Sequence, residues 1–423
     1  MYKPKISIIG AGYVGLPLAL EFGKKFQTNS VEISKKRLSL LNNKVDPGGE
    51  IKLSEFNKSK FLKFSNSFKS ISASDFVIVT IPTPINGVNK PDLRGLRICI
   101  KQISRYIKKK TIIIFESTFF PGLTDEICIP LLKKYSKLNF GKDFSVGYSP
   151  ERINPGDKKK LININKLVSA SHPFALRKVY SLYKQIIKAK VVKVKTIKVA
   201  ETAKVFENVQ RDTNIALANE LSMMTKKLNI NTLDVINAAS TKWNFVKYVP
   251  GLVGGHCISV DPYYLTYKSK MAGFDARIIN LARKINNGIV NFLIKEIKKI
   301  INKKFNSKLK ILILGLSYKE NVADYRNSKA IEIAKKLKSK YSNITFCDPL
   351  MNNSVAKEYN LKLKDIKNIK KKYDLVLLLV PHKTIISKIM NNIEKYTNHN
   401  SVIMDIKSSL KLSNVAKRDI WML

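Results

Sequence analysis

Short apolar runs alternate with polar stretches along both ends of the chain. The runs lie at residues 5–9, 76–81, 111–115 and 144–147, and again at 309–315, 343–347, 375–380 and 402–406. Strands of a parallel sheet are buried on both faces and are nearly continuous apolar runs, while the helices that connect them occupy the more polar stretches. The pattern predicts an α/β fold with two doubly wound parallel sheets.

The middle of the chain differs in its Gly and Pro content and in the spacing of its apolar residues. Residues 198–230 contain neither Gly nor Pro and carry apolar positions at helical spacing, and a second stretch poor in both follows Gly273 and runs to about Lys304. Both stretches predict long helices. We therefore expect α/β domains at residues 1–195 and 305–423, joined by a central helical domain at 196–304.

The charge of the chain is strongly positive. Its 423 residues include 77 Lys and Arg against 31 Asp and Glu, a formal net charge of +46. Such an excess attracts polyanions, so a basic nucleic-acid-binding protein is one hypothesis. Lys is spread over the whole length, however, and no nucleic-acid motif or interleaved aromatic and basic tract occurs. A Lys-rich surface is the favoured interpretation, with neither nucleic acid nor a membrane as partner.

The four cysteines indicate a reducing compartment. Cys99, Cys128, Cys257 and Cys347 lie far apart, with no CxxC pair and no His at metal-ligand spacing. Neither a disulfide framework nor a metal site is expected. The chain has no apolar run of about 18 residues, and its first residues lead directly into a strand-like run, so neither a membrane span nor a secretory signal is expected. The predicted location is the cytoplasm.

A glycine-rich turn follows the first apolar run. GAGYVG places Gly10, Gly12 and Gly15 between an expected strand and an amphipathic helix, where backbone approaches a pyrophosphate closely. Glu32 follows Gly10 by 22 residues, where a carboxylate binds both ribose hydroxyls and favours NAD over NADP. A solvated surface carboxylate is the alternative, because QTNSV is polar for a strand, and the nearby Arg37 would favour a 2′-phosphate. We predict a Rossmann-like NAD-binding turn.

The segment GLVGGHCISVDPYY carries the most chemistry. Cys257 follows two glycines, and Asp261 comes four residues later. If a helix begins near Cys257, the two residues share a face, and the amides of the helix N-terminus favour a thiolate. A buried inert cysteine is the usual alternative, but the neighbouring Gly, His and Asp favour a nucleophile.

A polar stripe lies along the predicted central helix. Lys204, Asn208 and Arg211 are spaced by four and three residues and therefore share one face. Such a stripe forms a solvated face, or it places a cation and an amide donor against a developing oxyanion. The spacing alone leaves both interpretations open.

Eight blocks of sequence carry a family resemblance. They are GAGYVGLPLALEFGKKF, IPTPI with PDL, FESTFFPGLTDE, SPERINPGDK, KVAETAKVFENVQRD, STKWNF, PGLVGGHCISVDPYYLTYKS and LGLSYKENVADYRNS. Collinear from residue 6 to about residue 410, they resemble the UDP-glucose/GDP-mannose dehydrogenase family, and most of all its UDP-N-acetylhexosamine (UDP-GlcNAc or UDP-GalNAc) 6-dehydrogenase branch, whose members supply capsule and O-antigen synthesis.

The resemblance implies a four-electron oxidation. The sugar C6 alcohol becomes a carboxylate at the expense of two NAD, through a cysteine thiohemiacetal and a thioester. UDP-glucose is the alternative substrate, and UDP-N-acetylmannosamine is a less favoured one. The long central helix resembles the dimerisation element of the family, which implies a homodimer or a higher homo-oligomer.

The resemblance also assigns residues. Cys257 is the nucleophile, Lys204 and Asn208 stabilise the alkoxide, Thr118 and Asp261 hold the hydrolytic water, and Glu151 is an acid or base near it. The cofactor contacts fall on Gly10, Gly12, Tyr13, Val14, Gly15, Glu32, Arg37, Thr83, Thr118 and Arg326. The UDP-sugar contacts fall on Arg152, Ile153, Lys204, Asn208, Arg211, Tyr248, Gly251, Gly254, Tyr318 and Lys319.

Two positions and one short stretch depart from the family pattern. Glu32 stands where Asp is usual, and Ser259 stands where Gly is usual, so that a side chain two residues after Cys257 restricts its loop. RINPG replaces the stretch in which the glucose-acting branch carries a second Glu. This last difference favours the N-acetylhexosamine branch and leaves the hydrolytic base open.

Overall fold

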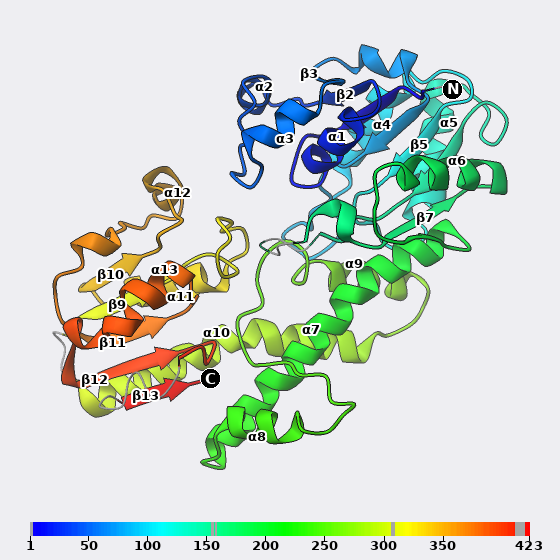
Figure 1. Ribbon diagram of the computed structural model, residues 1–423. Coiled ribbons are helices and arrows are strands. Elements are labelled where there is room, and N and C mark those ends of the chain that lie inside the picture. Colours follow the sequence, from blue (N-terminus) through cyan, green and yellow to red (C-terminus); the bar gives the residue numbers. More distant parts are fainter. Residues whose placement is uncertain (1–2, 154–155, 157–158, 306–308, 411–418) are drawn as a thin grey trace. The chain divides into compact units, whose positions relative to one another are not determined.

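The computed structural model describes residues 3–153, 156, 159–305, 309–410 and 419–423 (Figure 1). It divides into two compact units: Met1–Glu207 with Tyr263–Asp275, and Asn208–Pro262 with Ala276–Leu423. The first boundary falls inside the long helix α7 (Ile197–Lys227). The early turns of α7 belong to the first unit, where Glu201 binds the backbone of Gly122 and Thr124. The three domains predicted from the sequence stay a prediction.

The described part of the first unit contains an eight-stranded sheet of order β3-β2-β1-β4-β5-β6-β7-β8, parallel except where β7 meets β6. The strands are β1 (Ile6–Ile9), β2 (Thr28–Val31), β3 (Leu62–Ser65), β4 (Phe76–Val79), β5 (Ile112–Phe115), β6 (Ser145–Tyr148), β7 (Lys166–Ala170) and β8 (Val191–Lys193). The helices are α1 (Gly15–Gly23), α2 (Lys35–Asn42), α3 (Leu53–Lys58), α4 (Arg94–Ser104), α5 (Ile129–Ser136), α6 (Pro173–Lys184) and, bridging from the second unit, α9 (Asp261–Met271).

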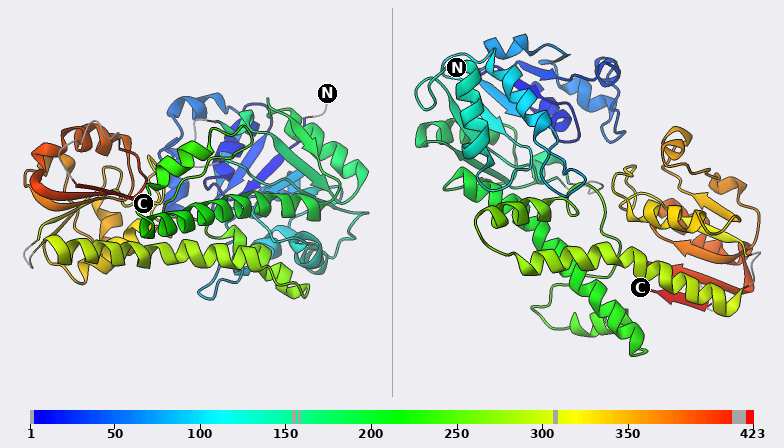
Figure 2. Two further views of the ribbon diagram at one scale, coloured as in Figure 1. Left: turned by 90° about the horizontal axis from the view of Figure 1, so that it is seen from below. Right: turned by 180° about the vertical axis from the view of Figure 1, so that it is seen from behind.

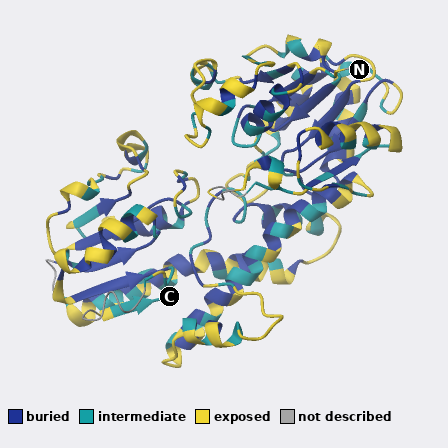
Figure 3. Ribbon diagram, in the orientation of Figure 1, coloured by how far each residue is buried: buried dark blue, intermediate teal, exposed yellow. Residues whose placement is uncertain are grey.

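The apolar runs form the buried strands, as expected. Every residue of β1, β4 and β5 is buried, and Figure 3 shows the central strands as the buried interior of the unit. The polar segment TNSV is also a strand, β2. It pairs in parallel with β1 on one side and β3 on the other, so the sheet satisfies its backbone whatever its side chains are. This pairing confirms that Glu32 follows the second strand directly.

In the second unit, five described strands form a parallel sheet of order β10-β9-β11-β12-β13. They are β9 (Ile311–Leu314), β10 (Ile344–Cys347), β11 (Tyr373–Leu378), β12 (Thr397–Asp405) and β13 (Asp419–Met422). The helices are α8 (Thr232–Ala239), α10 (Arg277–Lys304), α11 (Lys329–Lys338), α12 (Asn353–Glu358) and α13 (Lys383–Lys388). Both units thus have the predicted α/β architecture.

Helix α10 joins the helical and sheet parts of the second unit (Figure 2). Its later turns pack Leu293 and Ile297 into the core of the C-terminal sheet. Its earlier turns contact α7 through buried polar groups: Asn286 Nδ2 donates to Asp212 Oδ1 at 2.7 Å, and Asn219 Nδ2 donates to Asn286 Oδ1 at 2.9 Å. Buried amides require specific partners, so these contacts fix the register of the two helices. None of the helices in the described part of the chain is both long and apolar enough to span a bilayer.

Candidate active site

The glycine turn of the first unit is built for close approach of a ligand. Gly10 has φ +97°, and a Cβ on Gly15 would lie 1.8 Å from the Gly10 oxygen, so the fold itself requires both glycines. In the described part of the chain, a Cβ on Gly12 would meet nothing within 4 Å, and no side chain caps the N-terminus of α1. The amides of α1 therefore have the open surface that a dinucleotide pyrophosphate needs.

Glu32 is joined to this turn. Its Oε2 accepts from Ala11 N at 3.3 Å, and its Oε1 accepts from Ser34 N at 2.9 Å. Arg37 donates from NH2 to the Ala11 oxygen at 2.7 Å, and its Nε lies 3.6 Å from Glu32 Oε2. The carboxylate thus lies beside the predicted pyrophosphate site, at the place where a ribose follows. These residues fit an NAD molecule.

Other predicted cofactor residues lie at the carboxyl ends of neighbouring strands. Thr83 follows β4 and donates from Oγ1 to the Thr118 oxygen, which follows β5, at 2.7 Å. Tyr264 of α9 donates its hydroxyl to the Thr83 oxygen. Since β1, β4 and β5 are adjacent and parallel, the glycine turn with Tyr13 and Val14 shares one sheet edge with Thr83 and Thr118.

A buried charge cluster that the sequence did not reveal surrounds Glu151. Lys166 Nζ lies 2.7 Å from Glu116 Oε2 and 3.0 Å from Glu151 Oε2, and the Tyr183 hydroxyl donates to Glu116. The other oxygen of Glu151 accepts from the backbone amides of Arg152 and Ile153 at 2.7 and 2.8 Å. Both oxygens of the predicted acid or base are therefore engaged. In the sequence, Lys166 resembled any surface lysine.

The pKa values of Glu116 and Lys166 in this cluster are raised above their usual values. Burial raises the pKa of Glu116, even though Lys166 works in the opposite direction. Burial also disfavours the Lys166 ammonium, but the two carboxylates together raise the pKa of Lys166 above its usual value. Lys166 therefore stays charged and holds Glu151 in one position.

Glu201 organises the loop that follows β5. It accepts from Gly122 N at 2.6 Å, from Thr124 N at 3.0 Å and from Thr124 Oγ1 at 2.6 Å. Burial raises the pKa of Glu201 to about 7 despite these bonds. The buried Lys204 follows three residues later on α7 and belongs to the same unit. Arg152 of this unit pairs with Glu207, its NH2 2.6 Å from Oε1.

In the second unit, two predicted catalytic residues are in contact. Asn208 Nδ2 donates to Asp261 Oδ2 at 2.5 Å, and both side chains are buried. Asp261 N in turn donates to the Cys257 oxygen at 2.9 Å. These contacts connect Cys257, Asp261 and Asn208 within one unit. The sequence named the three residues as catalytic candidates but did not show these contacts.

The condition that a helix begins near Cys257 is not met. Residues 255–260 form turns, and α9 begins at Asp261. Pro262 occupies the first turn of α9, where its fixed φ and missing N–H are tolerated, and this favours a start at Asp261. Cys257 and Asp261 are therefore connected through one backbone hydrogen bond rather than by a shared helix face.

The loop Gly254–Ser259, which we call the nucleophile loop, packs against residues 315–328. Gly255 has φ +85°, and a Cβ there would lie 2.7 Å from the Tyr318 ring. Its oxygen accepts from Asn327 Nδ2 at 3.1 Å and from the Ser259 hydroxyl. Ser259 thus braces the loop, as its side chain led us to expect. Neither Asn327 nor its contact was predicted, because residues 255 and 327 are far apart in sequence.

Cys257 differs from the other cysteines. It is a half-buried free thiol, whereas Cys99, Cys128 and Cys347 are buried. Burial raises the pKa of Cys99 and of Cys347 to about 12 and raises that of Cys128 as well. These three thiols are inert, so the geometry favours Cys257 as the reactive one.

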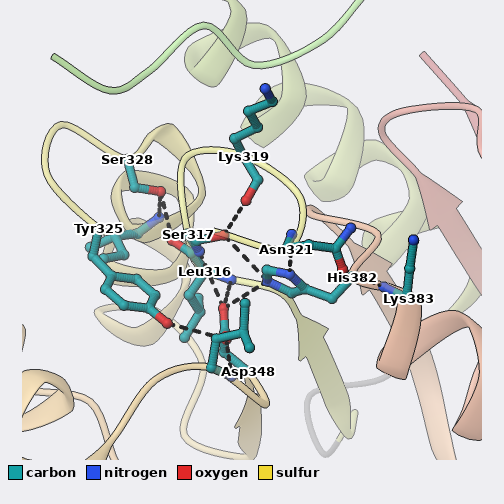
Figure 4. A network of polar contacts seen from close by, with 11 residues as sticks. Leu316, Ser317, Lys319, Asn321, Tyr325, Ser328, Asp348, His382 and Lys383 are labelled. Carbon is teal, nitrogen blue, oxygen red and sulfur yellow. Dashed lines mark hydrogen bonds and ion pairs between the residues drawn. The ribbon is translucent and has the colours of Figure 1, made fainter. Parts of the chain in front are cut away.

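Loop 315–328 is held by a buried network (Figure 4). Asp348 Oδ2 accepts from Leu316 N at 2.7 Å and lies 3.2 Å from His382 Nε2, while His382 Nδ1 accepts from Asn321 N at 2.9 Å. Burial opposes ionisation, but the hydrogen bonds from His382 and the backbone lower the pKa of Asp348. The Ser317 hydroxyl donates to the Lys319 oxygen, so this Ser–His–Asp group is a scaffold rather than a hydrolytic triad.

The network positions the predicted substrate residues Tyr318 and Lys319, which lie on that loop. The remaining substrate candidates of this unit are Arg211 and Tyr248, both half-buried, and Gly251 and Gly254. Gly251 is anchored on both sides by Asn219, which donates to its oxygen at 3.1 Å and accepts from its amide at 2.8 Å. Asn219 was missed because a mid-helix Asn has no sequence signature.

Arg326, predicted to bind the cofactor, pairs with a carboxylate. Its NH2 lies 2.6 Å from Asp324 Oδ2. The predicted set is thus divided between the units. Thr118, Glu151, Ile153 and Lys204 belong to the first, and Asn208, Cys257, Asp261 and Arg326 belong to the second.

Comparison with known proteins gives matches over nearly the whole chain. Three domain models of the UDP-glucose/GDP-mannose dehydrogenase family match: the NAD binding domain at residues 4–187, the central domain at 198–288 and the UDP binding domain at 312–412. UDP-N-acetyl-D-glucosamine 6-dehydrogenase of Salmonella typhi is 42% identical over 409 residues, 95% of this chain and 96% of that protein. Protein CapL of Staphylococcus aureus is 41% identical over 427 residues, 99% of both chains.

Solved structures agree with these matches. The structure of UDP-D-ManNAc dehydrogenase from Pyrococcus horikoshii has a TM-score of 0.87 at 27% identity and covers 99% of this chain and 98% of that one. The protein described here therefore belongs to the UDP-glucose/GDP-mannose dehydrogenase family and is an NAD-dependent nucleotide-sugar dehydrogenase.

Proposed function

We propose that this protein oxidises the C6 alcohol of a UDP-N-acetylhexosamine to the uronate, a four-electron reaction that uses two NAD and the Cys257 thiolate. The observation that carries the proposal is the connected group of Cys257, Asp261 and Asn208, with Cys257 as the half-buried thiol. Relatives at 42% and 40% identity are named UDP-N-acetyl-D-glucosamine 6-dehydrogenase, whereas one named UDP-N-acetyl-D-mannosamine dehydrogenase matches at 32%. UDP-N-acetylglucosamine is therefore the first substrate to test.

The glycine turn, Glu32 and Thr83 are the residues that would hold NAD, which supplies the hydride acceptor in both oxidations. Cys257 adds to the aldehyde carbon: the C–S bond forms and the carbonyl electron pair moves to oxygen. The amide of Asn208, whose orientation Asp261 fixes, stabilises that oxyanion. Lys204 precedes Asn208 by about one turn of α7 and supplies a positive charge for the same task.

Hydrolysis then releases the product. Water adds to the thioester carbonyl, the C–S bond breaks, and Cys257 leaves as the thiolate. Thr118 and Asp261 are the proposed water ligands. Glu151 is assigned a positioning role in this scheme, because its two oxygens accept hydrogen bonds from Lys166 and from two backbone amides.

The test is NADH formation with UDP-GlcNAc, UDP-GalNAc, UDP-ManNAc and UDP-glucose. We expect a UDP-N-acetylhexosamine to give the highest kcat/KM. A tenfold preference for UDP-glucose, equal to about 1.4 kcal/mol of transition-state discrimination, would overturn this substrate class. Cys257→Ser should abolish steady-state uronate formation, and Cys99→Ala, which alters a buried thiol, should retain it. Uronate formation by Cys257→Ser would refute the covalent mechanism.

The same proposal includes an assembly and a cellular role. Leu217 and Met224 are exposed and lie on one stripe of α7, with Leu221 between them at spacings of four and three residues, and the exposed Leu228 directly follows the helix. Such an exposed apolar stripe is typical of a subunit interface, so we expect a homodimer or a higher homo-oligomer. A monomer by light scattering at micromolar concentration would contradict this. We assign the enzyme to the cytoplasm and to capsule or O-antigen synthesis on the family resemblance alone.

A further inference from the structure

His256, the residue directly before Cys257, makes specific contacts that the sequence did not predict. Its Nδ1 lies 3.4 Å from Asp324 Oδ2, and its ring packs edge-on against Tyr318, with the centroids 6.2 Å apart. Cys257 directly follows His256 in the chain and is, after Asp324, the neighbour that most raises the pKa of the ring. The imidazole therefore has a carboxylate and the proposed nucleophile as neighbours, all within the second unit.

The charges around His256 come from two chain segments. The nucleophile loop contributes Cys257, and loop 315–328 contributes Asp324, Arg326 and the Tyr318 ring. The hydrogen bonds to Asp324 and to Cys257 raise the pKa of His256 to about 9, against the opposing effect of Arg326, whose NH2 lies 3.3 Å from Nδ1. Although burial works the other way, His256 and Arg326 keep the pKa of Asp324 below its usual range. These contacts thus favour the imidazolium, the form that the ring reaches once it has accepted a proton.

A purely structural role does not account for this arrangement. The nucleophile loop is already fixed at Gly255, whose oxygen accepts from Asn327 Nδ2 and from Ser259 Oγ. An additional contact that only held this loop in place would require neither an ionisable ring nor a carboxylate beside that ring. A cysteine, a histidine that contacts it and a carboxylate that orients the histidine form the arrangement that activates thiol nucleophiles.

We propose that His256 is a catalytic residue that takes the proton of the Cys257 thiol, and that Asp324 is the positioning residue that orients and charges the imidazole. The proposal rests on the proposed function of Cys257. The proton moves from Sγ to the imidazole ring, which leaves a thiolate and an imidazolium with no change in net charge. When the C–S bond breaks in hydrolysis, the departing thiolate meets the same imidazolium, so no proton is consumed over the cycle.

The experiment measures alkylation of Cys257 by iodoacetamide without substrate, from pH 5 to pH 9, on the full-length protein. Modification is followed by mass spectrometry of the Cys257 peptide, and Cys99, Cys128 and Cys347 are buried and serve as internal controls. We expect the wild-type rate to be nearly flat across the neutral range. In His256→Gln the rate at pH 7 should fall about tenfold or more and should rise about tenfold per pH unit above that.

Two further variants separate proton transfer from loop geometry. Asp324→Asn keeps the ring but removes its carboxylate, so we expect an intermediate loss of about threefold at pH 7 and a shifted pH profile. Asn327→Ala removes a loop hydrogen bond without removing the proton acceptor, so it should change the rate by the same factor at every pH. Thermal unfolding of each variant shows whether it is folded.

A His256→Gln profile within twofold of the wild type at every pH would overturn the proposal. A pH shift in Asn327→Ala equal to that in His256→Gln would also overturn it, because loop position alone would then control the thiol. Since no substrate is present, this outcome is independent of the uronate assay with Cys257→Ser. Failure of that assay would remove the proposed function while the alkylation profile still reported on the His256 and Cys257 pair.

Discussion

The first strand of each α/β unit is followed directly by a glycine with positive φ, Gly10 at +97° and Gly315 at +79°. In each unit the amide that follows this glycine donates to a carboxylate from the end of the adjacent strand. Ala11 N donates to Glu32 Oε2 at 3.3 Å, and Leu316 N donates to Asp348 Oδ2 at 2.7 Å. The two units thus share a local arrangement in which a strand, a glycine and a carboxylate from the adjacent strand occur together.

The two carboxylates have different surroundings. Among the described residues, Glu32 pairs with Arg37, which is itself 35% exposed, and it lies beside the open surface at Gly12. The Asp348 side chain has no exposed area and also binds Ser317 N, Leu350 N and His382. The first carboxylate can therefore meet a ligand, whereas the second folds the loop that carries predicted substrate residues. The shared motif thus sets the position of both carboxylates. Whether open surface lies beside a carboxylate decides whether it can bind a ligand.

The largest expected effect separates the glycines of the two turns. In Gly315→Ala the new Cβ would lie 2.2 Å from the Val380 oxygen at a positive φ, so we expect unfolding to become easier by about 3 kcal/mol or more. In Gly12→Ala the Cβ meets nothing within 4 Å, so stability should hold while the KM for NAD rises. Chemical denaturation and NAD titration measure both. Equal losses of unfolding free energy in the two variants would contradict the different roles assigned to Gly12 and Gly315.

The carboxylates themselves provide the next test. Asp348→Asn breaks a fully buried pair with His382, so we expect a loss of about 3 kcal/mol in unfolding free energy and weaker binding of UDP. Glu32→Gln should change stability by less than about 1 kcal/mol and raise the KM for NAD. Calorimetry of UDP and NAD binding with each variant measures the difference. Weakened NAD binding in Asp348→Asn alone would contradict the separation of roles.

The pH dependence of stability sharpens the contrast between a buried carboxylate with a raised pKa, Glu201, and one with a lowered pKa, Asp348. The folded-state pKa of Glu201 is raised from 4.5 to about 7, so its contribution to stability is present below pH 4.5 and is lost as the pH rises through 7. The lowered pKa of Asp348 gives the opposite sign: its contribution is present above pH 3.8 and is lost as the pH falls.

Glu201→Gln should therefore flatten the decline in unfolding free energy between pH 5 and pH 8 by about 2 to 3 kcal/mol relative to the wild type. Asp348→Asn should leave that decline in place. Denaturant midpoints at several pH values measure it, and an unchanged slope in Glu201→Gln would show that Glu201 titrates in the folded state as it does in the unfolded chain.

The smallest effect concerns the choice of cofactor at the open carboxylate. Glu32→Ser removes the charge that repels a 2′-phosphate and leaves Arg37 beside the turn, so the NADP to NAD ratio of kcat/KM should rise about tenfold, or about 1.4 kcal/mol. Adding Arg37→Ala to that variant should cancel the gain. If the NADP to NAD ratio of kcat/KM is unchanged in both variants, the ribose does not bind beside Glu32.

Much of the architecture follows from local sequence. Runs such as those of β1 and β9 are apolar because both faces of a parallel strand are buried, so their positions were predicted within a few residues. The long helix α7 was predicted from spacing and from the absence of Gly and Pro. The glycine turn was predicted because only glycine tolerates its φ and its close backbone contacts.

Contacts between distant residues were decided only by the tertiary structure. The strand β2 is polar and forms because two neighbours pair with it, and the start of α9 was displaced to Asp261 beside Pro262. Lys166 with Glu116, and His256 with Asp324, join residues 50 and 68 positions apart. The sequence determined the apolar strands, the long helix α7 and the glycine turn, because those depend on neighbours along the chain. Which charges meet depended on the folding of the whole sheet and its loops, because burial and partner distance exist only there.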